Sequence, residues 1–257
     1  MKVATWNVNS LRVRFPHVLK WLEQEQPDVL ALQETKLKDE DFPADAFLER
    51  GYSAVFSGQP GYNGVAILAR TAPAEVGYDF GNGYSDEHKR VLRATFGELR
   101  LWSLYVPNGQ SVESEKYSYK LEWLAELKAA LAAELTRHRS VLVVGDFNIA
   151  PEDRDVHDPK AWEGQVLCTP AERAALRALL DLGFQDVFRL FAQPEKTFSW
   201  WDYRGPAFRR NQGLRIDLML ASSELSQKCV SCRIDKEPRG WERPSDHVPV
   251  VAEFRWP

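Results

Sequence analysis

Polar side chains that could do chemistry occur in this sequence where apolar runs end. Asp146 and Asn148 follow the run 140–145, and Glu34 follows the run 28–33. Because side chains alternate along a strand, we expect Asp146 and Asn148 to face the same way. A carboxylate at the end of a buried strand is costly unless it has a partner or a function. Taken alone, this stretch is explained equally well by a turn, which Asp and Asn favour.

The same placement recurs along the chain and defines a candidate site. Polar residues that follow or interrupt apolar runs are Asn7, Glu34, Tyr105, Asn108, Asp146, Asn148, Asp217, Asp246 and His247. Strand ends that converge on one edge build a site there. The sequence has no serine nucleophile elbow and no glycine-rich phosphate loop. Hard oxygen ligands of this kind suit Mg²⁺, with Mn²⁺ able to substitute. The set therefore predicts metal-assisted phosphodiester hydrolysis.

His247 is of interest because of its neighbours. A histidine beside an aspartate such as Asp246 is more often an ordinary hydrogen-bonding pair. Asp217, at the end of the segment Leu-Arg-Ile-Asp, could orient His247 from a neighbouring strand. A carboxylate on one ring nitrogen fixes the tautomer and raises the pKa of the histidine. Such a histidine could donate to a phosphate oxygen.

Residues 197–210 interleave aromatic side chains with arginines, including Trp200 and Arg204. This pattern suits stacking combined with phosphate contact. A buried aromatic strand with a solvated basic end is the simpler alternative. The net charge of −4 shows that bulk charge does not hold a polyanion, so a local basic patch or a bound cation is needed.

The expected elements suggest two similar halves. Periodicity predicts helices over 12–24, 118–137 and 169–182, and strands over 3–8, 28–34, 52–56, 65–69, 91–96, 99–106, 141–148, 214–221 and 248–254. A helix followed by an acid-tipped strand occurs twice, which favours two packed sheets with helices outside. On the second helix, Leu121, Leu124, Leu131, Leu135 and the stem of Lys128 track one face. We expect one α/β domain over residues 1–257.

Cysteine content and the chain start predict a cytoplasmic protein. Three cysteines argue against a disulfide framework, and the lone pair Cys229-x-x-Cys232 lacks two further zinc ligands at a useful spacing. We therefore expect structural cysteines in a reducing compartment. The first residues carry no apolar signal region, and no apolar run is long enough for a membrane span.

A family resemblance runs through nearly the whole chain in order. Its motifs are Thr5-Trp-Asn-Val-Asn9, Leu32-Gln-Glu-Thr-Lys36, Tyr62-Asn-Gly-Val-Ala66, Tyr105-Val-Pro-Asn-Gly109, Gly145-Asp-Phe-Asn-Ile-Ala-Pro151, Phe198-x-Trp-x-Asp-Tyr-Arg204, Gly213-Leu-Arg-Ile-Asp217 and Ser245-Asp-His247. Each motif alone is weak, but together they resemble the exonuclease III class of the endonuclease/exonuclease/phosphatase superfamily. The resemblance implies a four-layer α/β sandwich, in which two mixed β-sheets pack face to face with helices outside. It also implies a divalent-metal DNA repair nuclease that cuts 5′ to abasic sites and processes 3′ ends.

The resemblance assigns a role to each residue of the candidate site. Glu34 is implied as the principal metal ligand, with Asn7 and Asp246 close by. Asp146 is implied to orient or deprotonate the attacking water, and direct metal ligation by Asp146 is the alternative. Asn148 is implied to hold Asp146 and to contact the phosphate.

The remaining roles concern the phosphate and the sugar. Tyr105 and Asn108 are implied to contact or polarise the phosphate. His247, paired with Asp217, is implied to steady the developing charge. The residues expected to bind the substrate further out are Trp200, Leu214 and Ile216, which line a pocket for a flipped-out abasic sugar, and Arg204. The implied partner is double-stranded DNA with abasic sites or 3′ ends. We expect a monomer without membrane association, near the bacterial nucleoid.

One position departs from a uniform family pattern. In one branch of the family, a bulky residue near 166–168 restricts abasic sites and favours 3′-end processing, and Leu167 is fairly bulky. A 3′-end-specific enzyme with weak activity at abasic sites is therefore an alternative. Two others are a phosphodiesterase of the same superfamily acting on RNA, inositol phosphates or lipid headgroups, and a non-catalytic nucleic-acid-binding regulator.

Overall fold

The computed structural model describes residues 1–256, and two strand–helix–strand units of the same design organise it. The first unit is β1 (Lys2–Asn7), α1 (Leu11–Glu25) and β2 (Val29–Gln33). The second is β7 (Leu99–Tyr105), α3 (Glu115–Leu135) and β8 (Ser140–Asp146). In each unit the helix connects two parallel strands that are direct neighbours. The parallel arrangement brings the carboxyl ends of both strands to the same edge, so each unit delivers its polar residues together.

Antiparallel strands extend each unit into a six-stranded mixed sheet. The first sheet has the order β11-β12-β1-β2-β4-β3 and the second has the order β5-β6-β7-β8-β10-β9. The added strands of the first sheet are β3 (Ser53–Ser57), β4 (Val65–Ala69), β11 (Cys229–Ile234) and β12 (Val250–Phe254). Those of the second are β5 (Ala74–Gly77), β6 (Val91–Phe96), β9 (Phe184–Asp186) and β10 (Asp217–Ser222). The halves predicted from the sequence thus correspond to the two sheets.

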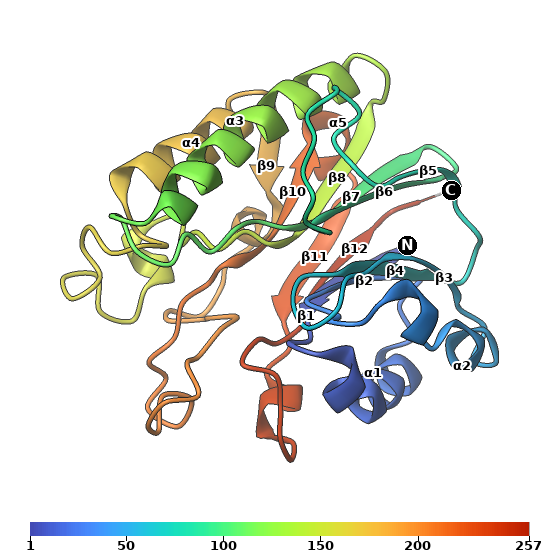
Figure 1. The fold of residues 1–257 in the computed structure, drawn as a ribbon, viewed down its shortest axis with the longest axis horizontal. Coiled ribbons are helices and arrows are strands. Elements are labelled where there is room, and N and C mark those ends of the chain that lie inside the picture. The colour runs from blue at the N-terminus through green and yellow to red at the C-terminus, as the bar shows by residue number, and fades with distance from the viewer. Residues whose placement is uncertain (257) are drawn as a thin grey trace.

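Two sheets with helices on their outer faces form four layers (Figure 1), and three apolar clusters lie between these layers. Side chains from both sheets, among them Ala31, Ile67 and Val144, form the core between them. The second sheet packs its outer face under α3 and α4 (Pro170–Leu180), and the first packs its outer face against α1 and α2 (Ala44–Leu48). The predicted four-layer α/β sandwich is therefore confirmed. Short helices complete the fold: α5 (Ser223–Ser226), η1 (Asp39–Asp41), η2 (Asp153–Asp155), η3 (Val187–Leu190) and η4 (Glu237–Gly240).

The buried face of α3 agrees only in part with the predicted one, in which Leu124 and Leu131 are buried as expected. Trp123 and Leu127 pack onto the sheet, whereas Lys128 is exposed and Leu121 is only partly buried. Two charged residues, Lys120 and Glu134, also lie on the inner side of the helix. Each has an ion-pair partner there, which offsets part of the cost of burying a charge.

The strand predicted over 214–221 begins only at Asp217. Leu214 instead pairs in isolated bridges with Val156 and Trp200, and the Arg215 backbone amide donates to the Asp155 carbonyl. These bonds draw the segment away from the sheet toward the loops that surround the strand ends. The capped helix expected near residue 170 is confirmed, since Thr169 and Glu172 form a reciprocal capping box.

The two chain ends lie next to each other, since the Phe254 backbone amide donates to the Met1 carbonyl. In Figure 1 they lie on the side of the sandwich away from the long loops of residues 150–168 and 190–212. Among residues 1–256, no helix has the length and apolar character that crossing a membrane requires.

Candidate active site

Asn7, Glu34 and Asp146 meet at the point where the two sheets face each other. Asn7 ends β1, Glu34 directly follows β2, and Asp146 ends β8 in the other sheet. One nitrogen of Asn7, Nδ2, donates to Glu34 Oε1 at 2.9 Å and to Asp146 Oδ2 at 2.8 Å. The carboxamide therefore bridges two carboxylates from different sheets.

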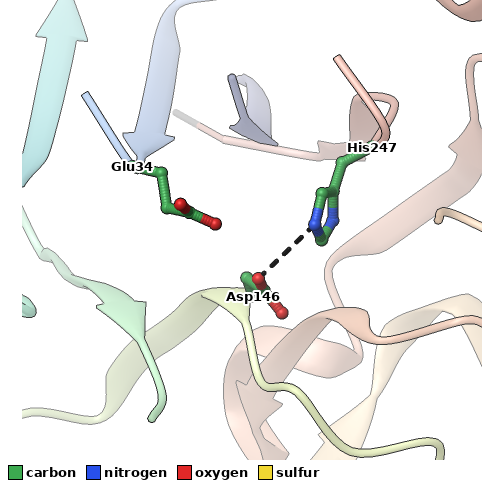
Figure 2. Close-up of side chains that lie close together, drawn as sticks. All are labelled: Glu34, Asp146 and His247. Carbon is green, nitrogen blue, oxygen red and sulfur yellow. Dashed lines mark ion pairs between the residues drawn. The ribbon is translucent and has the colours of Figure 1, made fainter. Parts of the chain in front are cut away.

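His247 completes the buried group from a segment near the chain end (Figure 2). Its Nδ1 lies 2.8 Å from Asp217 Oδ2, and its Nε2 lies 3.7 Å from Asp146 Oδ2. The pairing predicted between Asp217 and His247 is present in the structure. Asp217 is also the register partner of Asp146 in the antiparallel pair β8–β10, so the sheet itself aligns both carboxylates with the histidine.

Burial and the neighbouring charges shift the pKa values of Asp146 and His247. Burial raises the pKa of Asp146 to about 7, with Asp217 and Glu34 acting in the same direction and the charge of His247 opposing it. Burial lowers the pKa of His247, but the charges of Asp217 and Asp146 outweigh burial and raise it to about 10. Asp146 therefore exchanges its proton near neutral pH, as a general base requires. His247 remains a cation there.

Two of these groups suit a hard divalent cation. Glu34, Asp146 and His247 offer ligand atoms within 4.8 Å of one another. A protonated imidazole has no free lone pair, so His247 contributes positive charge and not a ligand atom. The carboxylate oxygens of Glu34 and Asp146 remain, and paired oxygen ligands of this type fit Mg²⁺. Asn7 directs its amide nitrogen at the carboxylates, while its Oδ1 accepts the backbone amide of Asn9 at 2.9 Å.

Asp246, expected near the metal, lies beside this group and outside it. Its Oδ1 accepts from Asn9 Nδ2 at 2.9 Å and its Oδ2 accepts from Trp200 Nε1 at 3.0 Å. The Lys36 ammonium lies 2.9 Å from Glu34 Oε2 and 2.5 Å from Asn9 Oδ1. Asn9 and Lys36 stand in the recognised motifs, but sequence reasoning gave neither of them a role.

Ser199 is a further residue that sequence reasoning missed. Its hydroxyl donates to Asp217 Oδ2 at 2.7 Å and accepts the backbone amides of Ile216 and Asp217. This serine therefore fixes the carboxylate that holds His247. Nothing in the residues around Ser199 distinguishes it from any serine in an aromatic segment.

Tyr105, Asn108 and Asn148 lie along the neighbouring edge of the second sheet. Burial, together with the charges of Glu34 and Asp146, raises the pKa of Tyr105 well above its usual value, so its hydroxyl keeps its proton and remains a donor. Asn108 Nδ2 donates to Asn148 Oδ1 at 3.0 Å. The Asn148 backbone amide donates to Asp146 Oδ1 at 2.9 Å, which holds the carboxylate as predicted.

Leu214, Ile216 and Trp200 lie together, and Leu167 packs with them. Leu214 and Ile216 are 0% and 1% exposed and Leu167 is 5% exposed. Leu167 adopts a φ of 77°, a left-handed conformation that is strained for a leucine. The three residues expected to bind a flipped sugar therefore lie together, and Leu167 packs against them in the same apolar cluster.

Arg204 is not brought into this assembly. Its side chain is 91% exposed and binds Asp202, with Nε to Oδ2 at 3.0 Å. Phe198 and Trp201 of the same segment are fully buried. The segment thus combines a buried aromatic start with a solvated basic end, the arrangement named above as the simpler alternative.

Comparison with known proteins agrees with this geometry. A model of the endonuclease/exonuclease/phosphatase family matches residues 4–247. Exodeoxyribonuclease III of Haemophilus influenzae is 38% identical over an alignment that covers 99% of this chain and 100% of the relative. A 3′ phosphatase from Neisseria, solved with a product DNA hairpin, is 43% identical with a TM-score of 0.97, and both chains are covered completely.

An AP endonuclease from Archaeoglobus fulgidus is 40% identical to this chain with a TM-score of 0.95, again with complete coverage of both chains. The family model and the relatives agree with the order of motifs in the sequence and with the sandwich of two sheets. The chain therefore belongs to the endonuclease/exonuclease/phosphatase family.

Proposed function

We propose that this protein, a DNA repair nuclease, hydrolyses DNA phosphodiesters 5′ to abasic sites and removes nucleotides or blocking groups from 3′ ends. The observation that carries the proposal is the complete buried group of Glu34, Asp146, Asp217 and His247, with its bridging Asn7. The relatives support the choice of DNA, since they include an exodeoxyribonuclease III, an AP endonuclease and a 3′ phosphatase.

The side chains of this chain account for the movement of the proton and the charge. Asp146 accepts a proton from water, and the resulting hydroxide attacks the phosphorus. The bond between the phosphorus and the 3′ oxygen breaks, and that oxygen takes a proton from solvent water to leave as the 3′-hydroxyl. The backbone amide of Asn148 donates a hydrogen bond to Asp146 Oδ1 and so fixes the orientation of the carboxylate. The His247 cation, held by Asp217, faces the same carboxylate and steadies the charge that develops on the phosphate. Asn108 and Asn148 supply amide donors, and Tyr105 supplies a hydroxyl.

We propose Mg²⁺ as the cofactor, with Mn²⁺ able to substitute. Glu34 is the principal ligand, and Asp146 is the second carboxylate close enough to share the cation. When bound, the cation neutralises and polarises the phosphate. Asn7 and Asp246 support the site from nearby, Asn7 through its bond to Glu34 and Asp246 through Asn9, whose side-chain oxygen holds Lys36 near Glu34.

The relative rates of cleavage at abasic sites and of 3′-end processing depend on Leu167, which favours 3′-end processing. This residue fills space beside Leu214 and Ile216, where a flipped abasic sugar would bind. A 3′-end-processing enzyme with weak AP endonuclease activity is therefore the second candidate. Trp200 stays available on the rim of the cluster, since it is only partly buried.

One experiment tests both candidates. Three matched duplexes carry an abasic site, a 3′-phosphate or a plain 3′-hydroxyl, and kcat/KM is measured for each in Mg²⁺. Cleavage of at least one duplex supports the nuclease proposal, and the ratio of rates separates the two candidates. Hydrolysis of a soluble phosphodiester without action on any duplex would favour another branch of the superfamily. DNA binding without cleavage would favour a regulator.

We also propose that residues 1–257 act as one catalytic domain and that the enzyme is a monomer in the bacterial cytoplasm near the nucleoid. The shared core between the two sheets supports a single folding unit. The free thiols of Cys168, Cys229 and Cys232 are consistent with a reducing compartment. Gel filtration with light scattering tests the monomer, and limited proteolysis tests the single domain.

A further inference from the structure

Lys120 is a fully buried lysine on α3, just behind the active site. Its ammonium donates to the carbonyl of Asn148 at 2.6 Å, to the carbonyl of Asn108 at 3.1 Å and to the carboxylate of Glu172. An ammonium has three N–H donors, so these three acceptors satisfy it completely. Two of the three are the backbones of the asparagines to which we assign phosphate contacts.

The partner Glu172 is equally buried and equally well bonded. Besides Lys120, its carboxylate accepts the backbone amide of Leu167 at 3.0 Å and the backbone amide and hydroxyl of Thr169 at 3.0 and 2.8 Å. One ion pair thus connects the loops that follow β7 and β8 with the loop that carries Leu167.

Packing around the lysine stem is tight. Gly109, the residue after Asn108, has a φ of +93°, and a Cβ there would lie 3.3 Å from Lys120 Cδ and 3.1 Å from Val166 Cγ2. The loop after β7 therefore lies directly between the lysine stem and the loop before α4. Lys120 therefore lies in close contact with the loop after β7 as well as in hydrogen-bond contact with the loop after β8.

The connection from Lys120 to the reacting groups is short. Lys120 holds the Asn148 carbonyl, the Asn148 amide holds Asp146, and the Asn148 side chain accepts from Asn108. A buried ion pair gives little net stability, and well-packed apolar residues often replace one without loss. Its value here lies in fixing geometry.

We infer that Lys120, paired with Glu172, is a positioning residue that sets the Asn108–Asn148 pair for catalysis and ties it to the backbone of Leu167. The inference rests on the proposed function. Small displacements of catalytic groups reduce rates by about 10²-fold per ångström. We therefore expect loss of the pair to lower kcat by about 10- to 100-fold on DNA substrates.

The test variant is Lys120→Met combined with Glu172→Gln. Methionine preserves the length of the lysine stem, and glutamine keeps the capping box with Thr169. The double change also avoids leaving one buried charge alone, as Lys120→Met by itself would. Lys128→Met, an exposed lysine on the same helix, controls for the lost charge.

Glu134→Gln is the matched control for a purely structural ion pair. Glu134 is buried at the other end of α3, and its Oε1 lies 3.1 Å from Arg100 Nε. This change is expected to lower the melting temperature and to leave kcat unchanged. The double variant is expected to lower kcat with a smaller or similar change in melting temperature.

A double-mutant cycle separates positioning from general destabilisation. If the ion pair acts through the asparagines, its loss lowers kcat less in an Asn108→Ala background than in the wild type. NMR signals of the Asn108 and Asn148 side-chain amides provide a readout independent of turnover. They are expected to shift or broaden in the double variant and to stay unchanged in Glu134→Gln.

A double variant with wild-type kcat and unchanged asparagine signals would overturn the inference. So would a loss of kcat of equal size in both backgrounds. Absence of DNA hydrolysis in the wild type would contradict the proposed function instead, and the asparagine signals would still decide whether Lys120 positions these residues.

Discussion

Asp146 and His247 have opposite charges and share a buried space, and this combination determines what each can do. The carboxylate exchanges its proton near pH 7, whereas the imidazole keeps its proton up to about pH 10. When the environment of a site drives the pKa values of two groups apart, one group can act as a base while the other keeps its charge. In the function that we propose, this difference gives the activation of water to Asp146 and the stabilisation of the phosphate charge to His247.

Asp146→Asn removes the base while keeping the shape of the side chain. An asparagine oxygen can still accept the Asn148 amide, so the fold should persist. We expect kcat on the preferred duplex to fall by about 10²- to 10⁴-fold, the usual contribution of a general base. Asp153→Asn, an exposed aspartate nearby in the chain, is the control and should keep wild-type kcat. Near-normal turnover by Asp146→Asn would remove Asp146 from the role of base.

Asp217→Asn tests the charge of His247 through pH dependence. The pKa of His247 is raised from 6.5 to about 10, so its protonation stabilises the fold fully below pH 6.5 and this contribution disappears as pH rises toward 10. Without the Asp217 carboxylate, burial should lower that pKa. We expect the alkaline limb of the kcat profile to move down by about one pH unit or more.

Unfolding in urea at several pH values provides the second readout for Asp217→Asn. The free energy of unfolding of the wild type should decrease more steeply between pH 7 and pH 10 than that of the variant. An unchanged alkaline limb together with parallel stability curves would show that Asp217 does not hold the proton on His247.

Leu167→Gly tests the choice of substrate. Glycine adopts the observed φ of 77° without strain, which relieves about 1–2 kcal/mol, but loss of the buried side chain costs about 2–5 kcal/mol. We therefore expect a modest net loss of stability. The emptied space beside Leu214 should raise kcat/KM on abasic duplex relative to 3′-phosphate duplex. Gln165→Gly, an exposed neighbour, should leave this ratio unchanged.

At the scale of elements, strand β8 must pass very close to β7 before it delivers Asp146. Gly145 has a φ of +140°, and a Cβ at this position would lie 1.9 Å from the Leu104 carbonyl oxygen. The two strands are parallel neighbours with Leu104 opposite Gly145. The close approach of β7 and the positive φ therefore explain the glycine in the Gly-Asp-Phe-Asn motif.

Gly145→Ala is expected to disturb the strand and the site together. The new methyl group forces the backbones apart, and overpacking of this kind costs about 1–3 kcal/mol, with further strain from the positive φ. Thermal unfolding should show a lower melting temperature, and kcat should fall because Asp146 is the next residue. Gly97→Ala, where φ is +59° and a Cβ would meet nothing within 4 Å, measures the effect of a positive φ without a steric clash. Equal effects at both glycines would argue against the close-packing explanation.

Helix α3 shows where periodicity fails at this scale. Leu124 and Leu131 are buried as predicted, but the buried face extends to Trp123 and Leu127 and also includes Lys120 and Glu134. A prediction based on the spacing of apolar residues places charged residues such as Lys120 and Glu134 on the solvent side of the helix. Only the partners Glu172 and Arg100, which lie far away in the sequence, make these two positions suitable for burial.

At the scale of the whole molecule, the site exists because two sheets face each other. Glu34 follows the carboxyl end of β2 in one sheet and Asp146 ends β8 in the other, and Asn7 links them directly. The carboxylates repel each other across this junction. A divalent cation that binds both would remove the repulsion and join the two halves.

Mg²⁺ is therefore expected to stabilise the folded enzyme. At a concentration 100 times Kd, binding to the folded state alone adds about 2.7 kcal/mol to the free energy of unfolding. Differential scanning fluorimetry with and without Mg²⁺ measures the shift. Glu34→Gln should abolish most of it, whereas Glu23→Gln, an exposed glutamate on α1, should not. Equal shifts in both variants would place the cation elsewhere.

The sequence by itself determined the local elements, the motif order and hence the family, because alternation, helix periodicity and turn residues act over a few neighbouring positions. Those same motifs identified Glu34, Asp146, Asp217 and His247. Only the tertiary structure decided which groups touch. Four features join residues that are distant in the chain: the bridge through Asn7, the hydrogen bond from Ser199, the buried Lys120, and the packing of Leu167 against Leu214 and Ile216. The proton affinities of Asp146 and His247 follow from burial and from the distance between their charges, and no local pattern encodes either quantity.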